Sequence, residues 1–391
     1  RSRKQRAQVA IGSGIQLGCH SLEARWHRFL GPRVSSAMGE TLAERQAAGR
    51  LKKEQELEKR RLAAAQKQEA KVAEQAQRAA ELERNLRQEA EKTTAGLDVQ
   101  WDVEFARVDP ALGPGLCLDI WRAEATECGG RPAPSIIWLH GGGWKFGTHH
   151  TMPGFLRALI KSGYAIVSVG YRLSKVAKFP ACLHDCKAAV RWIRAQGHVH
   201  GLCGQHIGVV GNSAGAHLAA LLGTTCGMDE LEGQELGWSE QSSAVDAVVA
   251  IAGPADLSST CSDLTSPKSL EAQLLGTPVG SAPERARLAS PAVHAASRRQ
   301  LPPFLLLHGD RDEEVPFQQS ELLLCTLLSN GSKADLLCIP GGTHLKFGER
   351  SSGGKPEAME AALESWTEAL ERSVPYFFDC HVAKRDVSAL A

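Results

Sequence analysis

The hydrophobic and polar positions along this chain follow one pattern before Gly96 and another after it. From Glu40 to about Thr93 the residues are almost exclusively Ala, Glu, Gln, Lys and Arg, without proline, and opposite charges such as Glu74 and Arg78 are four apart. This pattern predicts one long helix. Its larger apolar residues are too sparse for a firm heptad seam, which favours a solvated single helix or a weak coiled coil over a strong dimer zipper.

Beyond Gly96, short apolar segments alternate with longer helical patterns. An apolar run of about four to eight residues between turn residues is typical of a buried strand, whereas apolar positions three or four apart indicate a helix. Their alternation predicts an α/β fold, with a mostly parallel central sheet and helices on both faces. We expect strands at 99–108, 116–122, 136–139, 165–169, 207–210, 247–251, 304–307 and 335–339, the first two antiparallel, and helices at 153–161, 182–195, 214–222, 318–328 and 357–372.

These patterns also divide the chain. The first part is basic, with Glu23 as its single acid, and we interpret it either as part of an organellar targeting segment or as a disordered tail. The expected bounds are 1–39 for this tail, 40–95 for the charged helix or weak coiled coil, 96–378 for the α/β domain with a Ser- and Pro-rich insertion at 257–300, and 379–391 for a C-terminal tail.

Composition narrows the classes of function. The chain has 391 residues, of which 43% are hydrophobic, and a formal net charge of +1. This allows a sizeable core and argues against a nucleic-acid binder. The eleven cysteines form no C-x-x-C pair, and Cys182, Cys186 and Cys325 lie inside expected elements, so we interpret them as small buried hydrophobes in a reducing compartment.

The length of the longest apolar runs indicates whether a segment of the chain can span a membrane. They fall short of the roughly 20 residues that span a bilayer. We therefore expect a soluble intracellular protein, cytoplasmic or organellar, without a transmembrane segment. Self-association through the helix at 40–93 is the protein contact that we expect.

Candidate chemistry begins at Gly211–Gly215, whose sequence GNSAG fits G-x-S-x-G where a strand pattern changes to a helix pattern. Glycines on both sides of Ser213 allow the tight turn of a nucleophile elbow, in which the serine hydroxyl is exposed. The motif alone leaves open a helix-capping serine or a phosphate cradle. An attacking serine also needs a base, a carboxylate and oxyanion donors.

Candidates for the acid and the base follow in the chain order typical of α/β-hydrolases. Asp310 and Asp312 both follow the strand expected at 304–307, with a solvated turn of capping acids as the alternative. His344 directly follows the last expected strand and is the candidate base. His217 lies on the helix that leaves the elbow, where we expect it to pack or to cap the helix. We expect His149, His150, His198 and His200 on surface loops, without metal-ligand spacing.

The candidate oxyanion hole is the glycine-rich turn His140–Trp144, HGGGW, which follows the strand expected at 136–139. Glycines let backbone N–H groups turn toward a developing negative charge. We assign the hole to Gly142, Gly143 and the N–H of Ala214, and we expect Trp144 and Phe146 to line the acyl or alcohol pocket.

From about Trp101 to Val374 the chain resembles the α/β-hydrolase superfamily, most closely the BD-FAE-like branch of carboxylesterases. The resemblance implies ester hydrolysis through an acyl-enzyme, without cofactor, and it implies Asp312 as the acid, from its spacing to Val315 and Pro316. Ala216 departs from the glycine that relatives often carry. The resemblance does not cover residues 1–95 and rests on HGGGW at 140–144, GNSAGAHLAAL at 211–221, GPADL at 253–257, HGDRDEEVPFQQS at 308–320 and PGGTH at 340–344.

We therefore expect a serine esterase with the triad Ser213, His344 and Asp312, acting on a small-molecule ester, with no cofactor and no metal. The family includes enzymes acting on acetyl or feruloyl groups on sugars, on prenylcysteine methyl esters and on N-formylkynurenine. A formamidase or another amidase would share every residue named. A ligand-binding protein on the same fold is a further alternative, disfavoured because His344 is present.

Overall fold

The computed structural model describes residues 42–92, 94–108, 115–124, 131–260, 263–345 and 356–385. The expectations for the tail at 1–39 fall outside these residues. The chain divides into two compact units, 1–79 and 80–391.

The described part of the first unit belongs to helix α1 (Leu42–Glu91). Leu51 and Leu62 of this helix are exposed, with 57% and 61% of their surfaces accessible to solvent. A pair at i,i+4 joins Glu74 to Arg78 at 2.6 Å, and such exposed pairs contribute little to stability. The long solvated helix is confirmed, whereas a coiled coil stays a prediction.

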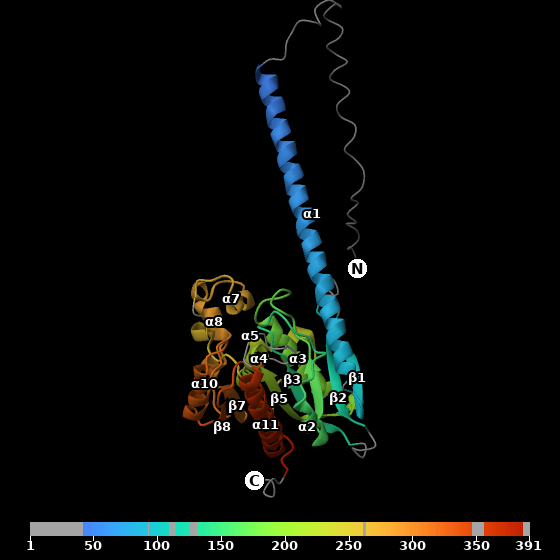
Figure 1. The fold of residues 1–391 in the computed structure, drawn as a ribbon, viewed down its shortest axis with the longest axis vertical. Coiled ribbons are helices and arrows are strands. Elements are labelled where there is room, and N and C mark those ends of the chain that lie inside the picture. Colours follow the sequence, from blue (N-terminus) through green and yellow to red (C-terminus); the bar gives the residue numbers. More distant parts are fainter. Residues whose placement is uncertain are drawn as a thin grey trace, which may run out of the picture. The chain divides into compact units, whose positions relative to one another are not determined.

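Among the described residues, the second unit is organised by one eight-stranded sheet (Figure 1). The strand order is β1-β2-β4-β3-β5-β6-β7-β8; β1 pairs antiparallel with β2 and β2 with β4, and the other pairs are parallel. The predicted mostly parallel sheet is confirmed. The strands are β1 (Leu97–Ala106), β2 (Leu116–Ala123), β3 (Ala133–Leu139), β4 (Ala165–Val169), β5 (Leu202–Asn212), β6 (Ala247–Ile251), β7 (Phe304–Gly309) and β8 (Ala334–Ile339).

Strand β5 is longer than the sequence pattern predicts. Leu202 and Cys203 pair with β3, and a register shift then separates them from the buried run that begins at Ile207. The intervening Gly, Gln and His interrupt the apolar run, so periodicity places the strand start too late.

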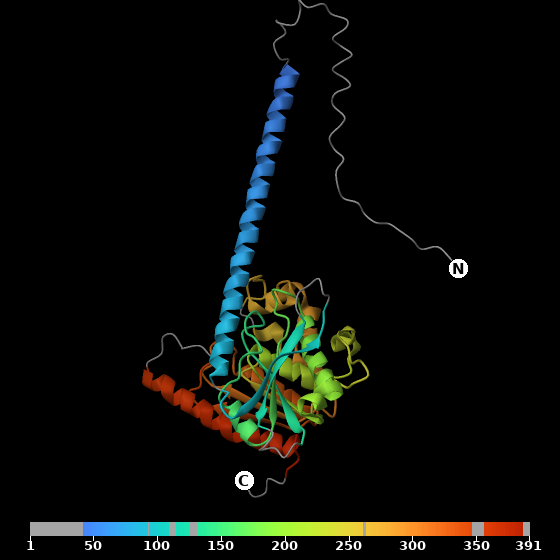
Figure 2. The ribbon, with the colours of Figure 1, turned by 90° about the vertical axis from the view of Figure 1, so that its right-hand side faces the viewer.

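Helices cover both faces of the sheet. Alternate residues of β3 belong to different cores, Ile137 to one and Ile136 to the other, as expected for side chains of a strand. The first core includes side chains of α3 (Ala181–Gln196), α4 (Ala214–Thr224) and α10 (Gln318–Ser329). The second includes side chains of α2 (Leu156–Lys161) and α11 (Pro356–His381), the long red helix in Figure 2.

One boundary differs from expectation. Helix α11 continues to His381 because Phe378 and Val382 are fully buried, so the α/β domain extends past residue 378. The insertion at 257–300 forms helices around short turns. The remaining helices are α5 (Asp229–Glu232), α6 (Leu257–Thr260), α7 (Leu270–Leu275), α8 (Pro283–Leu288) and α9 (Pro291–Ser297), with 3₁₀ turns at Gly197–His200, Gln234–Leu236 and Val279–Ser281.

The described cysteines are free thiols. Cys182 and Cys186 are buried, as expected, and burial raises the pKa of Cys182 to about 12. Cys325 is exposed, so the expectation of burial was wrong for it; it lies opposite the buried side of α10 formed by Leu323 and Leu327. None of the helices in the described ranges is long and apolar enough to cross a membrane.

Candidate active site

Ser213 lies in the turn between β5 and α4 with φ +54° and ψ −118°. A positive φ is uncommon for a residue with a side chain. The flanking glycines are required by space, since a Cβ on Gly211 would lie 2.2 Å from the Gly215 carbonyl oxygen, and one on Gly215 would lie 2.0 Å from that of Leu139. The Ser213 N–H donates to the Ile251 carbonyl on β6, 2.8 Å away. The sequence GNSAG thus forms a strand–turn–helix.

Three side chains form a hydrogen-bonded chain at this turn. His344 Nε2 lies 3.0 Å from Ser213 Oγ, and His344 Nδ1–H donates to Asp312 Oδ2 over 2.6 Å. Asp312 follows β7 and His344 follows β8, so all three residues lie beyond the carboxyl ends of parallel strands at the same edge of the sheet. Asp310 is exposed and accepts the backbone N–H of Gly341 at 2.7 Å.

The carboxylate of Asp312 is buried and ionised. Its Oδ1 accepts the backbone N–H groups of Glu314 and Val315, at 2.9 Å and 2.8 Å. Burial alone would raise the pKa of Asp312, but hydrogen bonds from His308, His344 and Val315 hold it well below its usual range. It therefore remains a negatively charged acceptor for His344.

His308 is a residue that the sequence analysis missed. It is the penultimate residue of β7. Its Nε2 lies 3.3 Å from Asp312 Oδ2, and the Nε2–H donates to the Val315 carbonyl at 3.0 Å. Its Nδ1 accepts the Ser320 hydroxyl at 2.7 Å. The sequence signal that could have identified His308 was its position four residues before Asp312, near the end of a buried strand.

The glycine turn begins at a buried histidine. The His140 ring stacks on Tyr171 with centroids 4.3 Å apart, and the Tyr171 hydroxyl donates to the His140 carbonyl at 2.8 Å. Gly142 and Gly143 have φ of +111° and +58°. A Cβ on Gly142 would lie 2.4 Å from the Phe146 carbonyl oxygen, so glycine is required there.

The Trp144 side chain is mostly packed beneath the glycine turn and exposes little surface to the pocket. Its side chain is 3% exposed, and its indole N–H donates to His217 Nδ1 at 3.1 Å. The His217 Nε2–H donates to the Ala289 carbonyl at 2.6 Å. Burial lowers the pKa of His217 to about 4, so this imidazole is neutral and packs under the turn.

A cavity of about 430 Å³ contains Ser213 and His344 at its wall. The expected oxyanion residues Gly142, Gly143 and Ala214 line it together with Trp144 and Phe146. Its wall is mostly apolar, with two carboxylates. The further lining residues that matter for its chemistry are Leu86, Trp138, Pro254, Leu270, Val315, Leu345, Glu271 and Glu314.

Leu86 belongs to the last turns of α1, which the sequence analysis placed outside the α/β domain. Residues from Ala80 onward belong to the same unit as the sheet. Here Arg87 donates to Asp102 on β1 and its guanidinium lies 5.2 Å from the centre of the Trp101 ring. The sparse leucines of the helix gave no signal of this contact.

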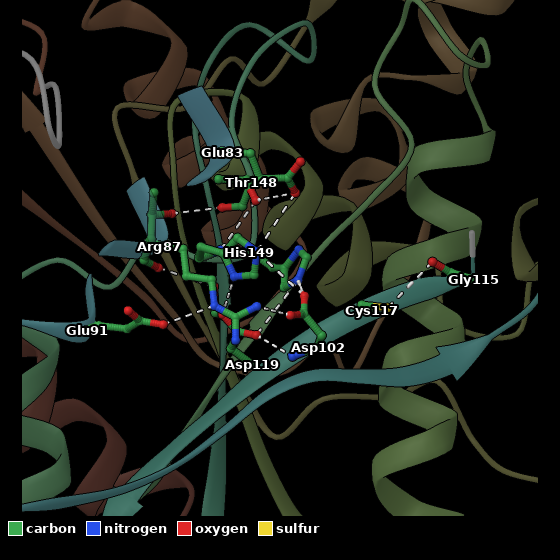
Figure 3. Close-up of polar contacts among 12 residues, drawn as sticks. Glu83, Arg87, Glu91, Asp102, Gly115, Cys117, Asp119, Thr148 and His149 are labelled. Carbon is green, nitrogen blue, oxygen red and sulfur yellow. Dashed lines mark hydrogen bonds and ion pairs between the residues drawn. The ribbon is translucent and has the colours of Figure 1, made fainter. Parts of the chain in front are cut away.

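His149 and His150 are buried, with 9% and 4% exposed, so the expectation of a surface loop was wrong for both. Their loop packs against Asp102 of β1 and Asp119 of β2 (Figure 3). His150 Nδ1–H donates to Asp119 Oδ2 at 2.8 Å. Asp102 and Asp119, which pair with these histidines, lie far from them in the sequence. His198 is exposed, as expected.

Comparisons with known proteins agree with this geometry. Esterase LipC from Mycobacterium tuberculosis is 33% identical over 240 residues, which cover 59% of this chain and 57% of LipC. Esterase LipQ from the same organism is 31% identical over 230 residues, covering 57% of this chain and 53% of LipQ. The chain thus spans little more than half the length of these curated relatives.

Solved esterases share the fold. A truncated carbohydrate esterase from gut microbiota has a TM-score of 0.57 and 28% identity, covering 63% of this chain and 89% of that protein. Thermogutta terrifontis esterase 2 with bound propionate has a TM-score of 0.50 and 26% identity, covering 71% and 95%. The α/β-hydrolase fold is confirmed. The sequence model of BD-FAE matches residues 118–327, more than half of the chain. The chain therefore belongs to the BD-FAE family of α/β-hydrolases.

Proposed function

We propose that this protein hydrolyses carboxylic esters through an acyl-enzyme intermediate. The observation that carries the proposal is the chain of hydrogen bonds from Ser213 through His344 to Asp312 at the wall of the cavity. A hydroxyl, an imidazole and an ionised carboxylate within hydrogen-bond reach are what a weak serine nucleophile needs. Relatives named as esterases support an ester as the substrate.

In the first half of the proposed reaction, Ser213 Oγ attacks the ester carbonyl carbon while His344 Nε2 accepts the hydroxyl proton. Asp312 keeps Nδ1 protonated and stabilises the imidazolium that forms. The carbonyl oxygen becomes an oxyanion, for which we propose the backbone N–H groups of Gly142, Gly143 and Ala214 as donors.

The tetrahedral intermediate then breaks its bond to the alcohol oxygen, which takes the proton from His344. The acyl group remains bound to Ser213 Oγ. A water molecule repeats the sequence: His344 accepts its proton, the hydroxide oxygen attacks the acyl carbon, and the proton returns to Ser213 as the acid departs.

The cavity suggests the kind of ester. Its wall is mostly apolar around Ser213, and its volume of about 430 Å³ suits a small substrate. Glu314 Oε2 lies 3.8 Å from His344 Nε2, and Glu271 also lines the cavity. Because two carboxylates disfavour a nearby anion, we propose an uncharged acyl group.

A panel of p-nitrophenyl esters from acetate to octanoate, assayed with the full chain, tests this function. We expect turnover that depends on acyl length and is lost in Ser213→Ala. Formanilide, compared with phenyl formate, tests the amide alternative with the same acyl group. A folded protein that turns over none of the esters contradicts the proposal, and a preference for the formanilide replaces it with an amidase.

A further inference from the structure

Asn212 precedes Ser213 and is the last residue of β5. Its side chain is 4% exposed and takes no part in the proposed chemistry. The Asn212 Nδ2–H donates to the backbone carbonyl of Leu345 over 3.1 Å, and Leu345 is the residue after His344. Ser213 and His344, which must meet for proton transfer, are thus joined a second time through their neighbours in the chain.

The backbone on both sides of His344 has few other hydrogen bonds. The turn that follows β8 ends its own backbone hydrogen bonds at Gly342. Within the described part of the chain, the backbone of residues 343–345 then makes one hydrogen bond, which is the bond from Asn212. The Leu345 side chain is buried in the second core. The position of the His344 backbone therefore depends on the packing of Leu345 and on the Asn212 amide.

Asn212 can serve as a fixed anchor because its own backbone belongs to the sheet. It pairs with Ile251 of β6, and the Ile251 carbonyl also accepts the N–H of Ser213. The glycine turn packs against the same side chain, since a Cβ on Gly141 would lie 2.7 Å from Asn212 Oδ1. A buried amide is normally held by hydrogen-bond partners. The Asn212 side chain is therefore fixed from several sides at the point where it meets Leu345.

The proposed reaction makes a strict demand on the position of His344. Its Nε2 lies 3.0 Å from Ser213 Oγ, and in each half of the reaction it must accept a proton from one oxygen and return it to another. A misplacement of about 1 Å can lower a rate roughly 100-fold. A small shift of the segment that carries the imidazole is therefore expected to reduce turnover strongly.

We propose that Asn212 is a positioning residue for the base: its amide holds the Leu345 carbonyl and thereby keeps His344 Nε2 at hydrogen-bond distance from Ser213 Oγ. This inference rests on the proposed serine mechanism. Asn212 acts through His344 and does not itself contact the reacting atoms. A neutral amide suits this role because it donates to a carbonyl without placing a further charge beside the imidazole.

The first test is steady-state hydrolysis of p-nitrophenyl acetate by the full chain. Asn212→Leu removes the donor at similar size, and Asn212→Ala removes it with the rest of the amide. Both variants are expected to lower kcat by about 10- to 100-fold and to change KM little, because the proton transfer is impaired and the apolar walls remain. Circular dichroism and thermal unfolding show whether each variant is folded.

Asn330 offers a matched control. It follows α10 directly and donates its Nδ2–H to the Ala295 carbonyl at 2.9 Å, a bond of the same kind outside the described wall of the cavity. Asn330→Ala therefore loses an equivalent hydrogen bond without a link to His344. We expect this variant to keep the kcat and KM of the parent chain.

A second test separates positioning of the base from a general structural role. His344→Ala is expected to keep a small turnover above the uncatalysed rate, supplied by the oxyanion donors and by binding. If Asn212 acts through His344, Asn212→Ala should change this residual turnover by less than about twofold, although it lowers kcat strongly when His344 is present. A damaged cavity or a lost contact with substrate would lower the turnover of both chains.

Two results overturn the inference: parental kcat in a folded Asn212→Leu or Asn212→Ala chain, or an equal loss on Asn212→Ala with and without His344. In the second case Asn212 acts on the glycine turn or on the substrate. Failure of the proposed function gives a different result, because Ser213→Ala would then keep parental turnover.

Discussion

The indole N–H of Trp144 donates a hydrogen bond to His217 Nδ1, 3.1 Å away, and thereby links the glycine turn to the helix that leaves Ser213. The other His217 nitrogen donates to the Ala289 carbonyl. Protonation of Nδ1 would place two N–H donors against each other. This buried imidazole must stay neutral for the contact to exist.

Stability is therefore expected to fall in acid. The pKa of His217 is about 4 in the folded chain and that of His140 is also about 4, against about 6.5 when unfolded. Between these values the unfolded chain binds more protons, so the free energy of unfolding decreases as pH falls from about 6.5 to 4, by at most about 1.4 kcal/mol per pH unit for each histidine. Urea unfolding at several pH values measures this slope.

His217→Gln isolates the contribution of His217, since glutamine keeps one acceptor and one donor without titrating. The variant is expected to be less stable at pH 7 but to lose less stability on acidification than the parent. An unchanged slope would show that His217 does not contribute to the acid sensitivity.

Ser213→Ala is expected to lower kcat by about 10⁶ while leaving the fold intact. The hydroxyl is the proposed nucleophile, and alanine adopts the same backbone without added volume. Ester turnover and circular dichroism measure the two effects. Ser239→Ala, at an exposed serine, is the matched control and should keep full activity. Near-parental turnover by folded Ser213→Ala would refute the assigned nucleophile.

Asp312→Asn is expected to lower kcat by about 10²–10⁴, because asparagine cannot stabilise the imidazolium and can hold His344 in the wrong tautomer. Asp310→Asn should have a much smaller effect, since Asp310 is exposed and bonds to the Gly341 backbone. The pair shares residue type and loop, which makes it a matched comparison. If the order of the two effects is reversed, Asp310 is the acid.

Leu86→Ala is expected to raise KM about tenfold for esters long enough to reach the α1 side of the cavity, with kcat less affected. Steady-state kinetics across acyl lengths measure the difference. Leu62→Ala, an exposed leucine earlier in α1, should change neither parameter. Equal effects of both substitutions on every ester would contradict a specific contact with substrate.

Truncation gives a related prediction. The sequence pattern indicates that a chain beginning at Gly96 keeps its activity, but the contact of Leu86 with the cavity and of Arg87 with Asp102 leads us to expect a higher KM and a lower thermal midpoint. A chain beginning at Ala80 keeps both contacts and should match the parent. Kinetics on the two truncated proteins decide between these expectations.

Much of the fold was predictable because the strands are buried apolar runs whose periodicity is local. The residues proposed for the triad were also predictable, since Ser213, Asp312 and His344 each lie shortly after a strand, and parallel strands bring their carboxyl ends together. The roles of these residues stay proposals. The helix before the sheet followed from its charge pattern.

The rest depends on contacts that no local pattern records. Leu86 resembles every other leucine of α1, and its position at the cavity results from tertiary packing. His149 and His150 read as loop residues because their partners, Asp102 and Asp119, lie on strands earlier in the chain. His308 lies within an apolar strand, so its position indicates a structural role. Its contact with the Asp312 carboxylate is visible only in the structure.

The walls of the cavity and the proposed triad come from different segments of the chain. Ser213, Asp312 and His344 stand at the ends of sheet strands, whereas Leu86 comes from α1 and Leu270 from the insertion. An engineer could therefore diversify the helix end and the insertion by mutagenesis while leaving the sheet untouched. Natural variation in those two segments offers the same route to new ester preferences, by exchanging surfaces around a constant reaction.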